Sequence, residues 1–361
     1  MKRLIATSIL LILLVVWPVR AQAPGQVRDD GDVRRLLLAL DRQERYLAKR
    51  RHKTLRLGRR RVPATRVIKT IRELRKVVLT AHGTPKFAQT IAERFEVVRV
   101  SQKALFTAYH SPLLPAREQP DAQFNVPILG MPPDLVLRRG RVYRRANGEL
   151  TSAPTRAQIM DGCYDARKLA VAWTNDAVEL YYTQIQGSAV LIYPGNRRKT
   201  LLFAGTNGYG YVSMERELIR RVPASERPGG YFGIRDYLRR HPDQADRYFR
   251  LNPRYIFFRL SDQPPTGMAG LPLTAKRSIA TDKRHYGAGL VGYVTYREPA
   301  ADASGAVSHR LVHRIVCDAD TGAAITGPNR VDIYFGEGSA RELFAAGLKN
   351  EGTLSYLLIR E

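Results

Sequence analysis

Residues 320–338 read DTGAAITGPNRVDIYFGEG, and this stretch decides how the chain is interpreted. Asp320 ends one β-prone run, and Asp332 lies within the next, at 330–335, with glycines and a proline between the two. Short β-prone runs separated by Gly and Pro predict strands joined by tight turns. The small neighbouring residues would let a backbone or a ligand approach the two carboxylates closely. The stretch therefore predicts β-structure that presents acidic side chains.

The same pattern of short β-prone runs and turn residues continues through most of the chain after residue 114. Turn dipeptides such as Asn147-Gly148 and Asn207-Gly208 separate the β-prone runs, as hairpins require. The expected strands are 97–109, 169–173, 178–186, 189–193, 255–259, 290–296, 309–317, 330–335 and 354–359. Many short strands with glycine turns favour barrels over a wound parallel sheet.

Helices are expected mainly before residue 97. Apolar residues recur at helical spacing after Asp32, which is placed to cap the first helix, and again after Thr65 and around Phe87. Two shorter helices are expected at 234–240 and 244–249. The fold class is therefore mainly β with N-terminal helices.

The first 23 residues are typical of a secretory signal peptide. Three residues with two positive charges precede an apolar run from Leu4 to Trp17, and small residues follow near Ala21 and Ala23. No cysteine follows this run, so we expect an exported protein of the periplasm or cell envelope without a lipid anchor. The two cysteines, Cys163 and Cys317, show no CxxC spacing, and a disulfide between them is left open.

The charge balance points to an anionic partner. The 361 residues include 59 Lys and Arg against 33 Asp and Glu, a formal net charge of +26. For an exported protein the available polyanions are polymers of the cell envelope, and we expect no nucleic acid partner. The sequence lacks the phosphate-binding GxxxxGK[ST] loop, HExxH and GxSxG, and Gly205, Gly208 and Gly210 do not make a GxGxxG. No metal, nucleotide or flavin cofactor is implied.

A third aspartate, Asp282, lies in the similar setting SIATD at 278–282. Any one of these aspartates alone is more simply explained as a turn cap. Together, their order and surroundings resemble the three-aspartate (3D) domain of the membrane-bound lytic murein transglycosylase A (MltA) family. Six further segments resemble motifs of that family in the same order: 106–112 (FTAYHSP), 124–136, 184–188 (QIQGS), 204–208 (AGTNG), 252–258 (NPRYIFF) and 271–274 (LPLT). The resemblance covers the chain from about residue 33 to its end.

The resemblance implies two domains after the signal peptide at 1–23. Residues 24–112 and 255–361 would form a double-psi β-barrel that carries the three-aspartate site. Residues 113–254 would form an inserted second β-barrel domain, with a glycan-binding groove between the two. We expect a monomer.

The resemblance also implies lytic cleavage of peptidoglycan between N-acetylmuramic acid and N-acetylglucosamine, with a 1,6-anhydro product. Asp332 would be the catalytic acid and base, with Asp320 beside it. The implied substrate-binding residues are Thr107, Tyr109, Gln186, Gly187, Ser188, Asn207 and Asp282. A catalytically inactive peptidoglycan-binding protein and a hydrolytic muramidase remain as alternatives.

Several positions depart from the family pattern. Ala108, Ala189 and Ala323 stand where the family has glycine. An added methyl group obstructs any backbone with positive φ and any sugar packed on the backbone. The shape of the groove is therefore expected to differ from that of the family, while the three aspartates are retained.

Overall fold

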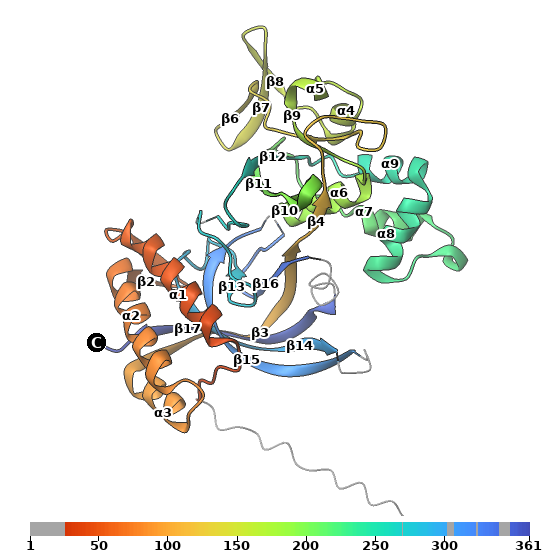
Figure 1. The fold of residues 1–361 in the computed structure, drawn as a ribbon. Coiled ribbons are helices and arrows are strands. Elements are labelled where there is room, and N and C mark those ends of the chain that lie inside the picture. Colours follow the sequence, from red (N-terminus) through yellow and green to blue (C-terminus); the bar gives the residue numbers. More distant parts are fainter. Residues whose placement is uncertain (1–25, 269, 302–306, 323, 339–346) are drawn as a thin grey trace, which may run out of the picture.

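The structure is a computed structural model that describes residues 26–268, 270–301, 307–322, 324–338 and 347–361. The predicted signal peptide and Ala323 lie outside the described residues. Figure 1 shows a barrel flanked by the N-terminal helices and a second unit that joins it through β3 and β4. The predicted fold class, mainly β with helices and a barrel, is confirmed.

Three helices and a hairpin form the N-terminal layer. They are α1 (Val33–Ala48), β1 (Thr54–Leu57), β2 (Arg60–Pro63), α2 (Ala64–Ala81) and α3 (Pro85–Arg94). Asp32 caps α1 as predicted, since its side chain accepts a hydrogen bond from the Arg35 amide. The apolar residues Leu36, Leu40 and Leu47 of α1 are fully buried in the core shared with the barrel. This burial fixes the helices against the barrel wall.

Six strands form the closed barrel, in the order β13-β15-β14-β17-β3-β16. They are β3 (Phe95–Ser111), β13 (Ser278–Ala280), β14 (Val291–Ala301), β15 (Val307–Asp320), β16 (Arg330–Glu337) and β17 (Lys349–Ile359). Strand β16 pairs in parallel with β3, which places Asp332 opposite Thr107. Val331, Ile333 and Phe335 of β16 enter the main core. Asp332 and Arg330 therefore share the opposite face of the strand.

The inserted unit contains a second ring of strands. Sheet β12-β11-β10-β4 comprises β4 (Leu113–Pro115), β10 (Ser188–Ile192), β11 (Arg198–Thr206) and β12 (Ile256–Ser261), and β5 (Val126–Leu129) pairs with β9 (Ala170–Thr174). Two isolated bridges, Gly130 to Phe258 and Arg117 to Trp173, join these two sheets into a ring. The ring encloses apolar side chains such as Leu191 and Leu201. A second barrel is thus present, closed by single bridges.

The insert also contains helices and strands that are not part of this ring. They are β6 (Leu135–Arg138), β7 (Arg141–Ala146), β8 (Glu149–Ser152), α4 (Arg156–Met160), α5 (Ala166–Leu169), α6 (Ala177–Gln186), α7 (Met214–Arg221), α8 (Gly230–Arg240) and α9 (Pro242–Arg250). In the described part of the chain, no helix combines the length and the apolar character needed to cross a membrane. Cys163, in the insert, and Cys317, buried in β15, are both free thiols.

One expectation from the sequence is wrong. Residues 178–186, predicted as a strand, lie in helix α6, because Asp176 caps its first turn and Gly187, at φ 84°, terminates it. Strand β12, which follows the expected boundary at residue 254, pairs with β11 of the insert. We therefore propose that the insert runs from Leu113 to Ser261.

Candidate active site

A cavity of about 330 Å³ is lined by residues of both units. The barrel contributes Thr107, Ala108, Tyr109, Ala280, Asp320, Thr321, Gly322, Ala324, Ile325, Arg330 and Asp332, and the insert contributes Arg156, Gln184, Ile185, Gln186, Tyr211, Asn252, Arg254 and Ile256. Asp320 and Asp332 thus line the same cavity as side chains that lie more than a hundred residues earlier in the sequence. Five of the predicted site residues line this cavity: Thr107, Tyr109, Gln186, Asp320 and Asp332.

Asp332 lies near the start of β16, opposite Thr107 of β3. The Thr107 hydroxyl donates a hydrogen bond of 2.7 Å to Asp332 Oδ1. Burial raises the pKa of Asp332 to about 6, and the charge of Asp320 adds to this, while the Thr107 hydrogen bond and the Arg330 charge oppose it. At neutral pH this carboxyl holds its proton far more often than an ordinary aspartic acid.

Asp320, at the end of β15, receives more hydrogen bonds than Asp332. The Tyr109 hydroxyl donates to its Oδ2 at 2.7 Å, and the amides of Met268 and Thr321 donate to its Oδ1 at 2.9 and 2.8 Å. Burial raises the pKa of Asp320, and these three donors oppose that rise by stabilising the anion. Of the two carboxyl groups, Asp320 is therefore the one prepared to carry the negative charge.

The insert wall is held close to the barrel by polar contacts at the end of α6. The His110 amide donates to Gln186 Oε1 at 3.4 Å. The hydroxyls of Ser188 and Ser111 are 3.0 Å apart, which connects β10 to β3. Gln186 is therefore positioned at the seam between the two units, where it lines the cavity.

Four of the predicted substrate-binding residues do not line the cavity. Gly187 ends α6, and Ser188 is buried against Ser111. The Asn207 side chain is buried and bonds the carbonyls of Pro154 and Pro253 and the Tyr255 amide, so it braces loops of the insert.

Asp282 is buried and does not line the cavity. Its carboxylate accepts hydrogen bonds from the Gly327 amide and from Arg284. The bonds from Arg284 come first among the interactions that hold the pKa of Asp282 well below its ordinary value. Asp282 thus anchors the loop between Asp320 and Asp332 at Gly327.

Sequence reasoning missed the cations of the cavity. Arg330 lies two residues before Asp332, and Arg156 and Arg254 line the insert wall. Arg330 was visible in the quoted stretch, because residues i and i+2 of a strand share a face. Arg156 and Arg254 carry no comparable signal, since only the folded insert brings them to the cavity.

The two described alanines at family glycine positions have different surroundings. Ala108 lines the cavity, so its methyl group narrows the groove. Ala189 is fully buried in the core of the insert ring, away from the cavity. Of these two departures, only the one at Ala108 alters the candidate site. Among the residues described, no three or more His, Cys, Asp or Glu side chains gather in a way that could hold a metal ion.

Comparisons with known proteins match both parts of the chain. The family model for the MltA specific insert domain matches residues 105–259, and the 3D domain model matches residues 277–358. A membrane-bound lytic murein transglycosylase A of Vibrio cholerae is 28% identical over 251 residues, covering 69% of this chain and 63% of that protein. The chain thus spans less than two thirds of the length of this relative.

Solved structures share the fold. The crystal structure of a membrane-bound lytic murein transglycosylase from Agrobacterium tumefaciens is 26% identical, with a TM-score of 0.74, covering 93% of this chain and 97% of that one. The crystal structure of Escherichia coli MltA with bound chitohexaose is 21% identical, with a TM-score of 0.72, covering 94% and 92% of the two chains. The second likeness concerns the fold alone.

Proposed function

The chain belongs to the MltA family, and from this premise we propose that it is a peptidoglycan lytic transglycosylase. The proposed reaction breaks the β-1,4 bond between N-acetylmuramic acid and N-acetylglucosamine and leaves a 1,6-anhydro-N-acetylmuramic acid end. The observation that carries this proposal is the half-buried Asp332 carboxyl, whose pKa desolvation raises to about 6, in a cavity between the two units. A carboxyl of this kind is suited to donate a proton near neutral pH.

One proton-transfer group is sufficient because the substrate supplies its own nucleophile. Asp332 donates its proton to the bridging oxygen as the bond from C1 of the muramic residue breaks. The C6 hydroxyl of the same residue then bonds to C1, and its proton passes to the Asp332 carboxylate. The acid is regenerated and no water is consumed. Holding the C6 hydroxyl close to C1 supplies the entropic part of the acceleration.

Asp320 is proposed to keep Asp332 protonated and to stabilise positive charge at C1. Its three hydrogen-bond donors favour its anion, and a negative charge beside Asp332 raises the pKa of the acid. We propose that Thr107, Tyr109 and Gln186 contact the glycan, since they line the cavity.

The test of this proposal is the mass of the released fragments. Incubation with purified sacculi should release muropeptides that end in the anhydro sugar, one water lighter than hydrolytic products. Fragments with a free reducing end would indicate the hydrolytic muramidase. Binding to sacculi without release would indicate the inactive binding protein.

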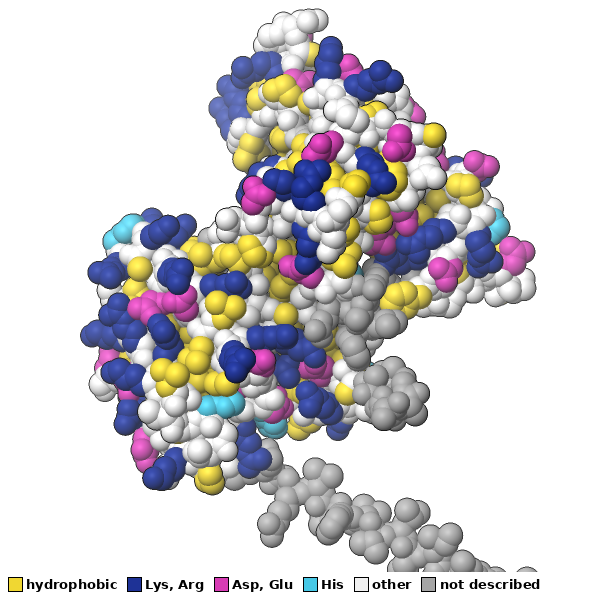
Figure 2. All heavy atoms as spheres, viewed as in Figure 1, with side chains coloured by type: hydrophobic (Ala, Val, Ile, Leu, Met, Phe, Trp, Pro, Cys, Tyr) yellow, Lys and Arg dark blue, Asp and Glu magenta, His cyan; other side chains and the backbone are white. Residues whose placement is uncertain are grey.

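The partner and location are proposed as peptidoglycan of the cell envelope, with anionic envelope polymers as a second contact. Lys and Arg side chains are spread over both units in Figure 2. A hollow of about 830 Å³ beside the β1–β2 hairpin is lined by Arg56, Arg59, Arg60, Arg61, Arg99, His285 and six other residues. Within the described residues, no ion pair engages Arg59, Arg61 or Arg99. Cations without acid partners are available to bind external anions.

This docking contact can be separated from turnover by salt. Raising the ionic strength should weaken binding to sacculi more than it slows cleavage of a short soluble glycan. The Arg59→Gln/Arg61→Gln double variant should bind sacculi less tightly and lose most of that salt sensitivity. Equal salt sensitivity for both substrates would remove the docking proposal and leave the catalytic proposal intact.

A further inference from the structure

Arg330 is placed in the cavity by the strand that carries the proposed acid. Residues 330 and 332 occupy the same face of β16, so their backbones are separated by roughly 6–7 Å along the strand. Both side chains line the cavity. The Arg330 guanidinium can therefore contact a ligand group that lies about one sugar ring away from the bridging oxygen that Asp332 would protonate.

Among the described residues, none provides a hydrogen-bond acceptor for the guanidinium of Arg330. Its Nη1 is shielded from solvent and makes no hydrogen bond to any described residue, and no described carboxylate forms an ion pair with it. A shielded charged donor without an acceptor is unfavourable, so a ligand that supplies an oxygen is favoured there. The positive charge of Arg330 also opposes protonation of Asp332.

The other two arginines of the cavity are already engaged. Arg156 donates to the carbonyls of Asn252 and Arg254 and to Gln184 Oε1. The Nη1 of Arg254 donates to the Tyr209 carbonyl at 3.0 Å. These bonds are used to hold the insert together. Among the described cations that line the cavity, Arg330 is thus the one without a protein partner.

The chemistry of the glycan limits what Arg330 could bind. Both sugars of the repeating disaccharide carry an N-acetyl group and hydroxyls, and only the muramic sugar carries a lactyl ether at C3. The lactyl carboxyl is free in glycans without peptides and forms an amide where a stem peptide is attached. Arginine binds a carboxylate with two parallel hydrogen bonds, and it binds a neutral carbonyl more weakly.

We propose that Arg330 is a specificity-determining residue that binds the lactyl carboxyl oxygens of the muramic sugar at the scissile bond. It would distinguish muramic acid from N-acetylglucosamine at that position and favour glycans whose lactyl carboxylate is free. This inference rests on the proposed function, since it takes peptidoglycan as the substrate. It assigns to Arg330 the choice of sugar, whereas Asp332 performs the proton transfer.

The experiment compares three ligands on Arg330→Gln, Arg330→Lys and the wild type. The ligands are muramic glycans with free lactyl groups, the same glycans with stem peptides, and chitohexaose, which has no lactyl group. For Arg330→Gln we expect kcat/KM on free-lactyl glycans to fall about 10- to 100-fold, with a smaller fall on peptide-bearing glycans. The Kd of chitohexaose should stay within about twofold. Arg330→Lys should recover part of the loss, since it keeps the charge without the fork.

A matched control and two opposing outcomes make the test decisive. Arg34→Gln removes one positive charge from an exposed position on α1 and should change none of the three measurements. An equal loss on all three ligands would overturn the proposal, because a merely structural arginine would weaken every ligand alike. If the wild type cleaves no glycan, the proposed function fails. The Kd ratio between free-lactyl glycan and chitohexaose then still tests Arg330.

Discussion

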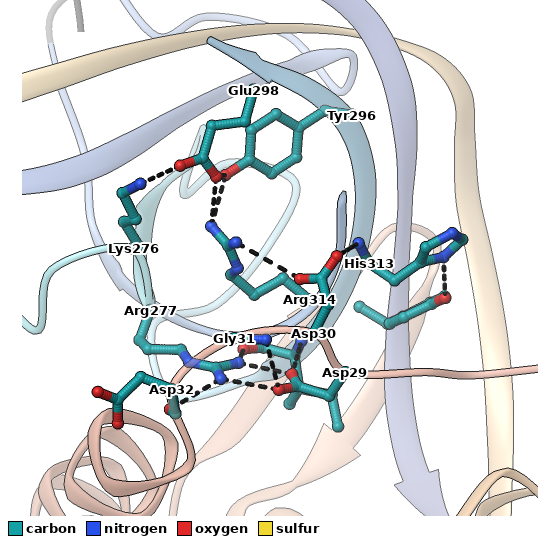
Figure 3. Close-up of polar contacts among 12 residues, drawn as sticks. Asp29, Asp30, Gly31, Asp32, Lys276, Arg277, Tyr296, Glu298, His313 and Arg314 are labelled. Atoms are coloured by element: carbon teal, nitrogen blue, oxygen red, sulfur yellow. Dashed lines mark hydrogen bonds and ion pairs between the residues drawn. The ribbon is translucent and has the colours of Figure 1, made fainter. Parts of the chain in front are cut away.

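Two groups of carboxylates that the barrel withdraws at least partly from solvent have opposite electrostatic settings. One group, Asp29 and Glu298, lies where the segment before α1 crosses the barrel, and Figure 3 shows it surrounded by arginine and lysine. The other group, Asp320 and Asp332, lies in the cavity and has mostly neutral donors. Burial acts on both groups in the same direction. Their partners decide whether each carboxyl remains ionised.

In the first group, every buried charge has a counterion. Arg277 donates to both carboxylate oxygens of Asp29 at 2.6 and 2.8 Å, with both side chains buried. Burial alone would raise the pKa of Asp29, but the bonds from Arg277 and His82 and the Ile315 amide bring it below its ordinary value. Burial likewise acts on Glu298, and its contacts with Arg314 and Lys276 hold the pKa of Glu298 below its usual range.

The cavity lacks such compensation. Asp332 has one short hydroxyl donor and a nearby Arg330, with which no ion pair is formed in the described structure, and the pKa of Asp332 rises to about 6. The contrast teaches that burial is offset by counterions at Asp29 and Glu298, whereas Asp332, where proton transfer is proposed, has no such ion pair among the described residues. A set of substitutions can test this contrast directly.

The largest effect is expected for Asp332→Asn. The amide is nearly isosteric but cannot donate an acidic proton, so kcat/KM should fall by about 10³-fold or more. Circular dichroism should show an intact fold. Turnover within about tenfold of the wild type would remove Asp332 from the proposed role.

The next largest effect is expected for Asp29→Asn, and it concerns stability. Removing one partner of a buried ion pair leaves the Arg277 charge uncompensated, so the free energy of unfolding should fall by about 3–5 kcal/mol. The control is Asp41→Asn on α1, whose Arg45 partner is largely exposed, with an expected change below about 0.5 kcal/mol. Urea unfolding measures both variants. Similar losses for the two would mean that burial of the Asp29 pair has no special importance.

Asp320→Asn should have an intermediate effect on activity. Some turnover should remain, because Asp332 still holds the transferable proton. Loss of a neighbouring negative charge lowers the pKa of Asp332, so the alkaline limb of kcat/KM should move to lower pH, by up to about one unit. Arg330, the other charged group beside Asp332, is unchanged in this variant. Because the two acids titrate together, the shift belongs to the pair. An alkaline limb that moves upward would reverse the proposed assignment of acid and anion.

The sequence predicted the acidic end of the cavity better than it predicted the buried ion pairs elsewhere in the barrel. Asp320, Asp332, Thr107 and Tyr109 were found because their neighbours resemble family motifs, and the structure brings these four side chains together. The Asp29–Arg277 pair joins residues 248 positions apart. Neither side chain has a local signal, so only the fold reveals the pair.

Local patterns failed where two signals conflicted. Residues 178–186 are rich in β-prone side chains, yet Asp176 and Gly187 provide a cap at each end, and the helix forms. In this segment capping and packing in the insert outweighed residue propensity. The ring of the insert could not be predicted either, because single bridges such as Gly130 to Phe258 close it.

The smallest effect predicted is a pH-dependent gain in stability for Asp332→Asn. The folded-state pKa of Asp332, about 6, lies above the ordinary value of 3.8, so the folded protein keeps a proton that the unfolded chain has lost. As pH rises from about 4 to 6, this difference lowers the free energy of unfolding of the wild type, and above pH 6 the penalty is constant. Asparagine carries no such penalty. The variant should therefore equal the wild type in stability near pH 4 and exceed it by about 1–3 kcal/mol at pH 7.5. The lower part of this range is expected, because Asp332 is partly exposed.

The ionised Asp29 side chain affects the free energy of unfolding with the opposite sign, because the pKa of Asp29 is lowered in the folded protein. The stability that it contributes is present above the ordinary pKa of aspartic acid and is lost as pH falls. Urea unfolding of both proteins at the two pH values measures the difference. Equal stability at pH 7.5 would mean that the Asp332 carboxylate is as well solvated as the compensated acids, and the contrast between the two groups would not hold.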